Sequence, residues 1–390
     1  MAELASVGAE PALVSPVEPA RPAGSASARR ERWSSRRYAL EMRREPGAAR
    51  QALILGIALL AGLLVSAAIL VTAGVPADEL LNEFVLHTFF DLQNLHAVLF
   101  QGAPMILVGL AAAISFRARF WNLGLEGQMV WGAIGATAVS LFEIGPESLR
   151  LPLMLCAGAA GGLLWVLGPV LLKLRVGVNE IISTLMLNYI AANFLLHLLY
   201  GSWKDAKDSF PHSPQFRVFE QLPQLGGSGV SSAIVLALVV ALLAWWLVDV
   251  SRAGLYLRCI HANAAMADAV GVPVQKVVLG TVLVSGALAG VAGFAVAAGQ
   301  EGRLTQAFYE GYGFSGILIA FMARNNPLAA AVVALLVAAL FVTGRSLQVF
   351  YQVPFAMVQL VQAIIVIAVA GSDFFIRHRL RRVASAEVRT

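Results

Sequence analysis

The stretch QALILGIALLAGLLVSAAILVTAGV, residues 51–75, contains no charged residue. Residues 230–248 and 277–299 are equally free of charge. An α-helix needs about 20 apolar residues to cross the hydrocarbon core of a bilayer, which is about 30 Å thick. Membrane-spanning strands would instead alternate between apolar and polar residues over segments of about ten residues, and these stretches do not. All three therefore predict transmembrane helices.

The composition of the whole chain agrees with this prediction. Hydrophobic residues make up 58% of the 390 positions, charged residues make up 13%, and the mean hydropathy is +0.75. A soluble domain carries about 25% charged residues, so a soluble fold of this size could not bury so much apolar surface. We expect an all-α integral membrane protein, a polytopic bundle of about ten transmembrane helices in the lipid bilayer.

The remaining apolar segments set the limits of these helices. We expect spans at 51–74, 96–116, 123–142, 151–172, 178–200, 230–249, 275–299, 305–323, 327–344 and 354–371. The eighth contains Glu310, Gly311, Gly313 and Gly316, a composition that also suits a broken or half-spanning helix. Pro327 is a natural first residue for the ninth helix.

The distribution of Lys and Arg predicts the orientation in the membrane. With ten spans and a cytoplasmic N-terminus, 22 of the 28 basic residues fall on the cytoplasmic side. This asymmetry follows the positive-inside rule. Both termini are then cytoplasmic. Because topology accounts for the basic residues, the pI near 9.5 does not call for a nucleic-acid partner.

The chain divides by composition into three parts. Residues 1–50 form a polar, Arg-rich cytoplasmic segment that we expect to be largely disordered. Residues 51–372 form the transmembrane domain, and residues 373–390 form a basic cytoplasmic tail. The longest cytoplasmic loop between helices spans 250–274. Its Ala-rich part favours a short helix that stops at Gly271 and Pro273.

The sequence contains no pattern typical of an enzyme or of a cofactor site. None of the four lysines follows a glycine, so the chain has no phosphate-binding loop of the Gly-x-x-x-x-Gly-Lys type. It also lacks the His-Glu-x-x-His metal motif and a nucleophile elbow. We expect a protein that is not an enzyme and binds no metal or cofactor itself.

Polar residues inside apolar spans are the candidates for function, because such residues are costly in a membrane. Seven of them could line a substrate pathway: Asn122, Glu126, Gln128, Asn179, Glu180, Thr184 and Asn188. Residues 180, 184 and 188 share one helix face. That face suits either an aqueous pathway or interhelical hydrogen bonds.

A purely structural interpretation of the same residues is also open. Glu126 and Glu180 could lie at the cytoplasmic surface and complement helix N-termini, with Asn122 and Asn179 as N-caps. The pair Gly286-x-x-x-Gly290 favours close helix packing over a gate.

Three motifs resemble those of the permeases of ABC importers in the simple-sugar and nucleoside branch. They are FWNLGLEGQ at 120–128, VNEIISTLMLNYI at 178–190, and YGFSGI at 312–317 together with RNNP at 324–327. The resemblance covers about residues 100–370. It is nearest to the longer of the two permeases in nucleoside importers of the basic-membrane-protein type.

This resemblance implies a place in the inner (plasma) membrane of a bacterium, partners and a mechanism. The partners are a second permease that forms a heterodimer, a cytoplasmic ABC ATPase that binds ATP and Mg, and an extracytoplasmic substrate-binding lipoprotein. The mechanism is alternating access driven by the ATPase. The resemblance also makes the helix in the 250–274 loop a coupling helix that docks on the ATPase. Its expected contact residues are Asn263, Ala264, Ala265, Met266 and Gly271, although the Asn-Pro common at its start is Asn263-Ala264 here.

The substrate remains open at this point. A nucleoside is the first expectation, and a simple sugar of the ribose type is the alternative. A proton-coupled secondary transporter, with Glu126 or Glu180 carrying the proton, is a third possibility. It would leave the coupling-like loop without a role.

Overall fold

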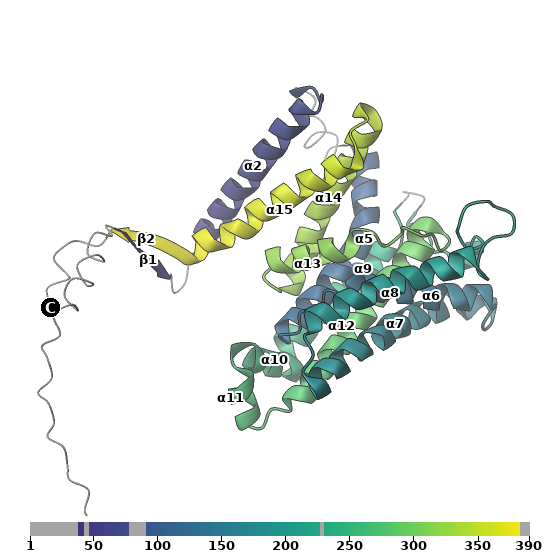
Figure 1. The fold of residues 1–390 in the computed structure, drawn as a ribbon, viewed down its shortest axis with the longest axis horizontal. Coiled ribbons are helices and arrows are strands. Elements are labelled where there is room, and N and C mark those ends of the chain that lie inside the picture. Colours follow the sequence, from purple (N-terminus) through teal and green to yellow (C-terminus); the bar gives the residue numbers. More distant parts are fainter. Residues whose placement is uncertain (1–37, 43–46, 78–90, 227–229, 383–390) are drawn as a thin grey trace, which may run out of the picture. The chain divides into compact units, whose positions relative to one another are not determined.

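A computed structural model of the chain describes residues 38–42, 47–77, 91–226 and 230–382. Outside the described residues lie most of the 1–50 segment predicted to be largely disordered, most of the outer loop after the first helix and the end of the basic tail. The elements in chain order are β1 (Tyr38–Met42), α2 (Ala48–Thr72), α5 (Leu92–Arg117), α6 (Leu125–Leu141), α7 (Glu147–Leu171), η3 (Leu172–Val176), α8 (Glu180–Tyr200), η4 (Val218–Glu220), α9 (Ala233–Trp245), η5 (Trp246–Val250), α10 (Arg252–Ala262), α11 (Ala264–Ala269), α12 (Val274–Val296), η6 (Ala297–Glu301), α13 (Tyr312–Met322), α14 (Pro327–Tyr351), α15 (Phe355–Arg377) and β2 (His378–Arg382) (Figure 1).

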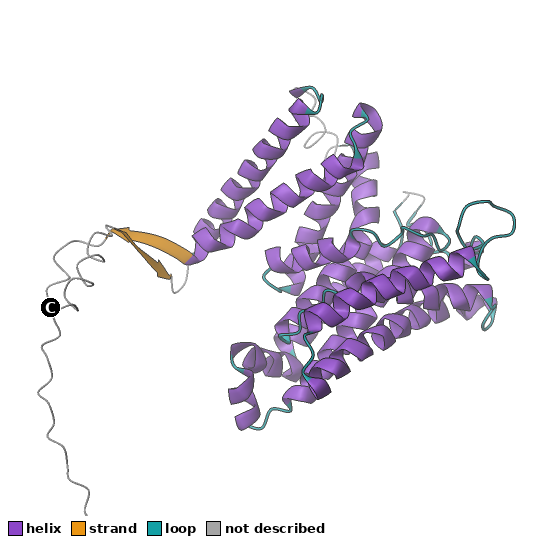
Figure 2. Cartoon of the chain, in the orientation of Figure 1, coloured by secondary structure: helices purple, strands orange, loops and turns teal. Residues whose placement is uncertain are grey.

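The chain forms two compact units, residues 52–373 and a smaller one that combines 1–51 with 374–390. In the smaller unit β1 pairs with β2 in an antiparallel ladder that runs from Tyr38 opposite Arg382 to Met42 opposite His378. Figure 2 shows these two strands in orange; the sequence had predicted no strand. The placement of both ends on the cytoplasmic side stays a prediction.

The all-α, multi-pass architecture of the larger unit is confirmed. Eight helices of the described part are long and apolar enough to cross a membrane. Two more occupy predicted spans but are shorter: α6 has 17 residues and α13 has 11. The segment 302–311 is not helical, so α13 is the half-length helix that its glycines and Glu310 allowed. Asn326 caps α14, and Pro327 is its first residue as predicted.

Helix α5 forms the centre of the larger unit. Its residues from Gln101 to Phe116 are all buried, and it contacts α9, α12, α13 and α14. Asp91 caps its N-terminus through a hydrogen bond from the Gln93 backbone. Pro104 lies inside the helix, and membrane helices tolerate such a proline where neighbours cover the backbone.

Glycines bring α6, α7 and α12 into close contact. A Cβ added to Gly290 would lie 2.2 Å from the carbonyl oxygen of Gly158, and one added to Gly162 would lie 2.2 Å from that of Gly286. One added to Gly132 would lie 2.3 Å from the carbonyl oxygen of Gly290. The three backbones therefore touch directly. This confirms the prediction that Gly286-x-x-x-Gly290 is a packing motif.

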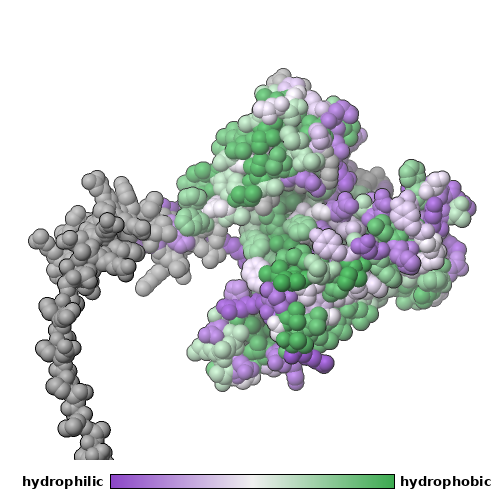
Figure 3. Space-filling view, viewed as in Figure 1, coloured by the Kyte–Doolittle hydropathy of each residue, from purple (hydrophilic) through white to green (hydrophobic). Residues whose placement is uncertain are grey.

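The loops gather at the two ends of this unit as the predicted topology requires. At the end that we call inner, Arg117 contacts both Asp249 and the carbonyl of Asn325. At the outer end, the backbone N–H of Phe216 donates to the carbonyl of Gly302. Between the ends, many large apolar side chains are exposed on the helices, as on α7, α8 and α9, which suits contact with lipid (Figure 3).

Candidate substrate pathway and coupling surface

The segment between α5 and α6 folds into the protein and is held there by amides. Asn122 and Gln128 exchange two side-chain hydrogen bonds, of 3.0 and 2.8 Å. Asn122 also donates to the Ser285 hydroxyl at 3.2 Å, and that hydroxyl donates to the carbonyl of Ala111 at 2.7 Å. Both amide side chains are almost completely buried. The network thus joins α5, α6 and α12.

Helix α8 contacts the same segment through its polar face. Asn188 accepts a hydrogen bond from the backbone N–H of Gly127 and donates to the carbonyl of Leu123, both at 2.9 Å. The hydroxyl of Thr184 accepts from the backbone N–H of Leu123 at 3.3 Å. Backbone without a helical partner must find other hydrogen bonds at membrane depth. Here α8 supplies them.

The side chain of Glu126, a residue of α6, lies against the N-terminus of α13. Its carboxylate interacts with the backbone N–H groups of Gly311, Gly313 and Phe314. A Cβ added to Gly313 would lie 2.3 Å from Cγ of Glu126, so only glycine allows this approach. A negative charge at a helix N-terminus is favourable because the unpaired N–H groups there carry positive partial charge.

The position of Glu126 follows from the length of α13. The helix rises 1.5 Å per residue, so Gly313 lies about 14 Å from its inner end at Met322. Glu126 complements a helix N-terminus, as one prediction had it, but that helix is not its own, and the contact lies about 14 Å from the inner end of α13.

The remaining two candidates lie at the inner end of α8. Asn179 is its N-cap, as predicted, and accepts from the backbone N–H of Ile181 at 2.9 Å. Glu180 is buried and pairs with Lys173. The matching prediction for Asn122 is wrong, because the N-cap of α6 is Gly124. Asn122 instead accepts from the Gly124 backbone N–H at 3.1 Å and points its amide into the protein.

The structure therefore brings four candidates together as a hydrogen-bonded cluster around residues 120–124, the non-helical stretch between α5 and α6 that we call the broken segment: Asn122, Gln128, Thr184 and Asn188. Glu126 lies on the side of this cluster that faces α13, and Asn179 lies apart from it. A second buried polar chain was missed by the sequence analysis. Gln101 donates to the hydroxyl of Tyr312 at 2.8 Å, and that hydroxyl donates to Gln300 at 2.8 Å. None of these pairings could be expected from the sequence, because single amides and tyrosines in apolar helices give no pairing signal.

The loop predicted to couple to an ATPase contains two short helices at the inner end. Asn263 caps α11 by accepting from the Met266 backbone N–H at 3.2 Å. Gly271 ends the turn after α11 with a left-handed φ of +87°, a conformation that suits glycine. Ala267 is buried. Met266 and Val270 are exposed at 66% and 71%. The helix prediction is confirmed, and its exposed side chains are apolar apart from Asp268.

Two arginines connect this loop to the rest of the inner end. Arg119 donates to the carbonyls of His261 and Ala262 at 3.0 and 3.2 Å, immediately before Asn263. Arg117 forms an ion pair with Asp249 at 2.9 Å. Arg117 is the last residue of α5 and Arg119 lies two residues beyond it, so the coupling loop is tied through Arg119 to the segment that carries residues 120–128.

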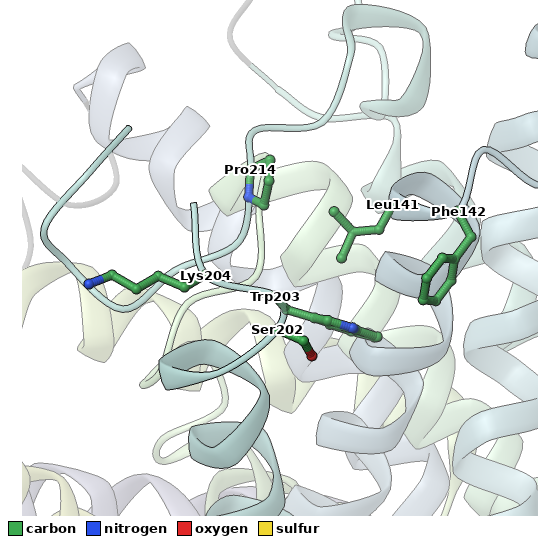
Figure 4. Close-up of a pocket in the computed structure, with 6 residues that line it drawn as sticks. All are labelled: Leu141, Phe142, Ser202, Trp203, Lys204 and Pro214. Atoms are coloured by element: carbon green, nitrogen blue, oxygen red, sulfur yellow. The ribbon is translucent and has the colours of Figure 1, made fainter. Parts of the chain in front are cut away.

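The outer end is built on an ion pair and a shallow cavity. Arg150 and Glu220, both buried, pair at 3.1 Å and join α7 to η4. A cavity of about 200 Å³ lies between the end of α6 and the loop after α8. Trp203 meets Phe142 edge to face there, while the side chain of Lys204 points away from them (Figure 4). Among the described residues no group of three His, Cys, Asp or Glu side chains could hold a metal ion.

Residues 94–370 match the permease component of the branched-chain amino acid transport system family. The chain belongs to this family. It is thus a multi-pass permease of the inner (plasma) membrane, and the family consists of transport subunits rather than enzymes.

Several curated relatives resemble the permease over most of its length. The glucose ABC transporter permease protein TsgB13 of Haloferax volcanii is 31% identical over 335 residues, 83% of this chain and 88% of the relative. The guanosine ABC transporter permease protein NupP of Bacillus subtilis is 32% identical over 327 residues, 82% and 92% of the two chains. A second guanosine permease of that organism, NupQ, is 27% identical over 271 residues, 66% and 84% of the two chains.

Proposed function

We propose that the permease imports a nucleoside as one half of a heterodimer, with a separate ATPase that binds ATP and Mg and an extracytoplasmic binding lipoprotein. The similarity to NupP carries this proposal, because it extends over 92% of that guanosine permease. NupQ, from the same organism, is more distant at 27% identity. Two related permeases in one organism support a heterodimer in which this chain takes the position of NupP.

The geometry at the inner end supports coupling to an ATPase. An exposed apolar edge of Met266 and Val270 is presented on a short capped helix, and such an edge suits burial against a partner. Arg119 connects that helix to the segment 120–128, so a displacement of the loop reaches the middle of the permease. We infer that residues 263–266 and Gly271 form the docking surface.

The polar cluster then has a role in alternating access. Asn122, Gln128, Thr184 and Asn188 make their hydrogen bonds within the chain, so we infer that they hold the broken segment in place. Glu126 and the N-terminus of α13 would be the part that a moving substrate meets. Broken helices of this kind mark substrate sites in other transporters. Asn179 and Glu180 would fix the inner end of α8.

A simple sugar is the second candidate, because TsgB13 is a glucose permease of comparable similarity. Reconstitution decides between them. The tagged chain, purified from its native cells in mild detergent, should bring a second permease and an ATPase, and the complex in liposomes with its binding protein should import radiolabelled guanosine on addition of ATP. Import of glucose without import of nucleosides would favour the sugar. Uptake that collapses at once with an uncoupler while ATP lasts would overturn the ATP-driven mechanism.

A further inference from the structure

A cavity of about 390 Å³ lies between the outer halves of α5 and α14. Its walls include the rings of Phe100, Phe341 and Phe350, and its polar lining includes Gln101 and Arg345. Pockets for small molecules range from about 300 to 1,000 Å³ and combine apolar walls with a few polar groups. The cavity has the size and the lining of such a site, and the polar cluster around residues 120–128 does not use it.

Gln101 gives the cavity a polar lining that is connected to two other helices. The side chain is buried and donates one N–H to the hydroxyl of Tyr312, which in turn donates to Gln300. A primary amide has a second N–H and a carbonyl oxygen, and within the described part of the chain neither has a protein partner. Tyr312 is the first residue of α13. An occupant that contacts Gln101 would therefore act on the helix whose N-terminus faces Glu126.

Arg345 supplies a cation that has no anionic partner among the residues that the structure describes. Its guanidinium carbon lies 5.4 Å from the centroid of the Phe341 ring, and among the described residues it has no ion pair. Helix α14 runs to Tyr351, seven residues past the predicted end, so Arg345 is on a membrane helix rather than in a loop. A charged residue there is costly and usually serves a function. An arginine that stacks on a ring keeps N–H donors for a planar acceptor pair.

We propose that this cavity receives the base of a 6-oxopurine nucleoside, such as guanosine or inosine, on its way into the permease. The flat base would pack against the phenylalanine rings. Its O6 and N7 acceptors would face Arg345, in the bidentate pairing by which arginine recognises guanine. Gln101 would contact the base from the other side. Adenine presents an N6 donor in place of O6, so the arginine would disfavour it.

The inference rests on the proposed function and specifies its substrate class. A hexose has no π-system to stack on three phenylalanines. A lipid phosphate would be satisfied by Arg345 alone and would make no use of the buried Gln101. The base of a purine nucleoside uses both polar groups and the apolar walls together.

Photolabelling of the complete complex tests the site. The permease with its partner subunits, in nanodiscs, is irradiated with 8-azidoguanosine, and the adducts are located by peptide mass spectrometry. We expect adducts within residues 94–101 and 341–350 that guanosine and inosine compete away and adenosine does not. Arg345→Leu should lower the labelling about tenfold, in line with the loss of one bidentate contact. Phe350→Ser, at the exposed rim, should also lower it.

Gln348→Leu is the matched control, because Gln348 is exposed on the same helix and does not line the cavity. Each variant is checked by yield and by size-exclusion profile. Adducts elsewhere, or labelling unchanged in Arg345→Leu, would overturn the inference. If labelling stays intact in Arg345→Leu while the yield of that variant depends on the content of anionic lipid, the cavity is a lipid site instead. If the wild-type complex imports glucose and no nucleoside, the proposed function fails; if it imports guanosine without labelling the cavity, only this inference fails.

Discussion

Asn188 in α8 pairs with the backbone of Gly127 in α6 at 2.9 Å, and its amide nitrogen donates to the carbonyl of Leu123 at the same distance. One side chain thus satisfies a donor and an acceptor of a segment that has not yet become helical or has only just done so. This resembles the way a backbone strand pairs with another, and it fixes the point at which α6 begins.

Asn188→Leu should destabilise the permease, because it leaves a backbone N–H and a carbonyl unpaired inside the protein. Each such group costs about 1–3 kcal/mol. The midpoint of thermal unfolding in detergent should fall by several degrees, measured by size-exclusion after heating. Asn193→Leu is the control: Asn193 is exposed on the same helix and bonds only to the carbonyl of Tyr189 within it. Equal midpoints for the two variants would contradict a special role of Asn188.

Gly290→Val should prevent folding of the membrane domain. An added Cβ would lie 2.2 Å from the carbonyl oxygen of Gly158 and 3.0 Å from the Cα of Gly162, so α7 and α12 would have to separate. Overpacking a close contact costs at least about 1–3 kcal/mol. The matched control is Gly280→Val, in the same helix, where nothing lies within 4 Å of an added Cβ. The readout is the yield of monodisperse protein, and a normal yield for Gly290→Val would show that the contact can relax.

The positions of the helices could be predicted from the sequence because uncharged runs of about 20 residues have few other solutions. The length of α13 could not. The predicted span contains apolar residues over 312–322 but also Glu310 and several glycines. A hydropathy average over the whole span does not show at which residue the helix begins. Helix α6 likewise starts two residues later than predicted, because Leu123 and Gly124 are held by α8 and Asn122 rather than by helical hydrogen bonds.

The polar candidates were found from the sequence, but their partners were not. Asn122 suited an N-cap by its position, yet its amide pairs with Gln128 and Ser285, of which Ser285 lies 163 residues away. Pairings over such distances depend on the packing of α5, α6 and α12. The ladder of β1 and β2 was missed for the same reason, since its two strands lie at opposite ends of the chain.

The outer loop should respond to acid through Asp208. His212 contacts its carboxylate at 2.8 Å, and this hydrogen bond lowers the pKa of Asp208 below its usual range. A depressed pKa means that the contribution to folding is present above the unfolded pKa of about 3.9 and is lost as the pH falls through the lower folded value. The local structure of the loop should therefore persist to below about pH 4. Trp203 fluorescence during an acid titration reports it.

The comparison for that titration is Asp208→Asn, which has no charge to lose. Its loop should lack the acid transition of the wild type while retaining the fluorescence change of the rest of the protein. Identical titrations of the two proteins would show that the contact with His212 does not hold the loop. Asp268→Asn, exposed on α11 at the inner end, controls for the removal of one carboxylate elsewhere.

Arg119→Ala should uncouple ATP hydrolysis from import. The guanidinium holds the last two carbonyls of α10, those of His261 and Ala262, and thereby ties the coupling loop to the chain just before Asn122. The docking surface on α11 would stay intact, so the ATPase should still co-purify. Without the tie, loop movement reaches the 120–128 segment less directly. We expect import per ATP hydrolysed to fall about tenfold, within the usual range of coupling free energies between sites.

The control is Arg252→Ala, because Arg252 is exposed on the first turn of α10. This variant should change neither the co-purification of the ATPase nor the import per ATP hydrolysed. Loss of the ATPase from the Arg119→Ala complex would mean that the arginine shapes the docking surface itself, and unchanged import per ATP would mean that force reaches the membrane domain by another path.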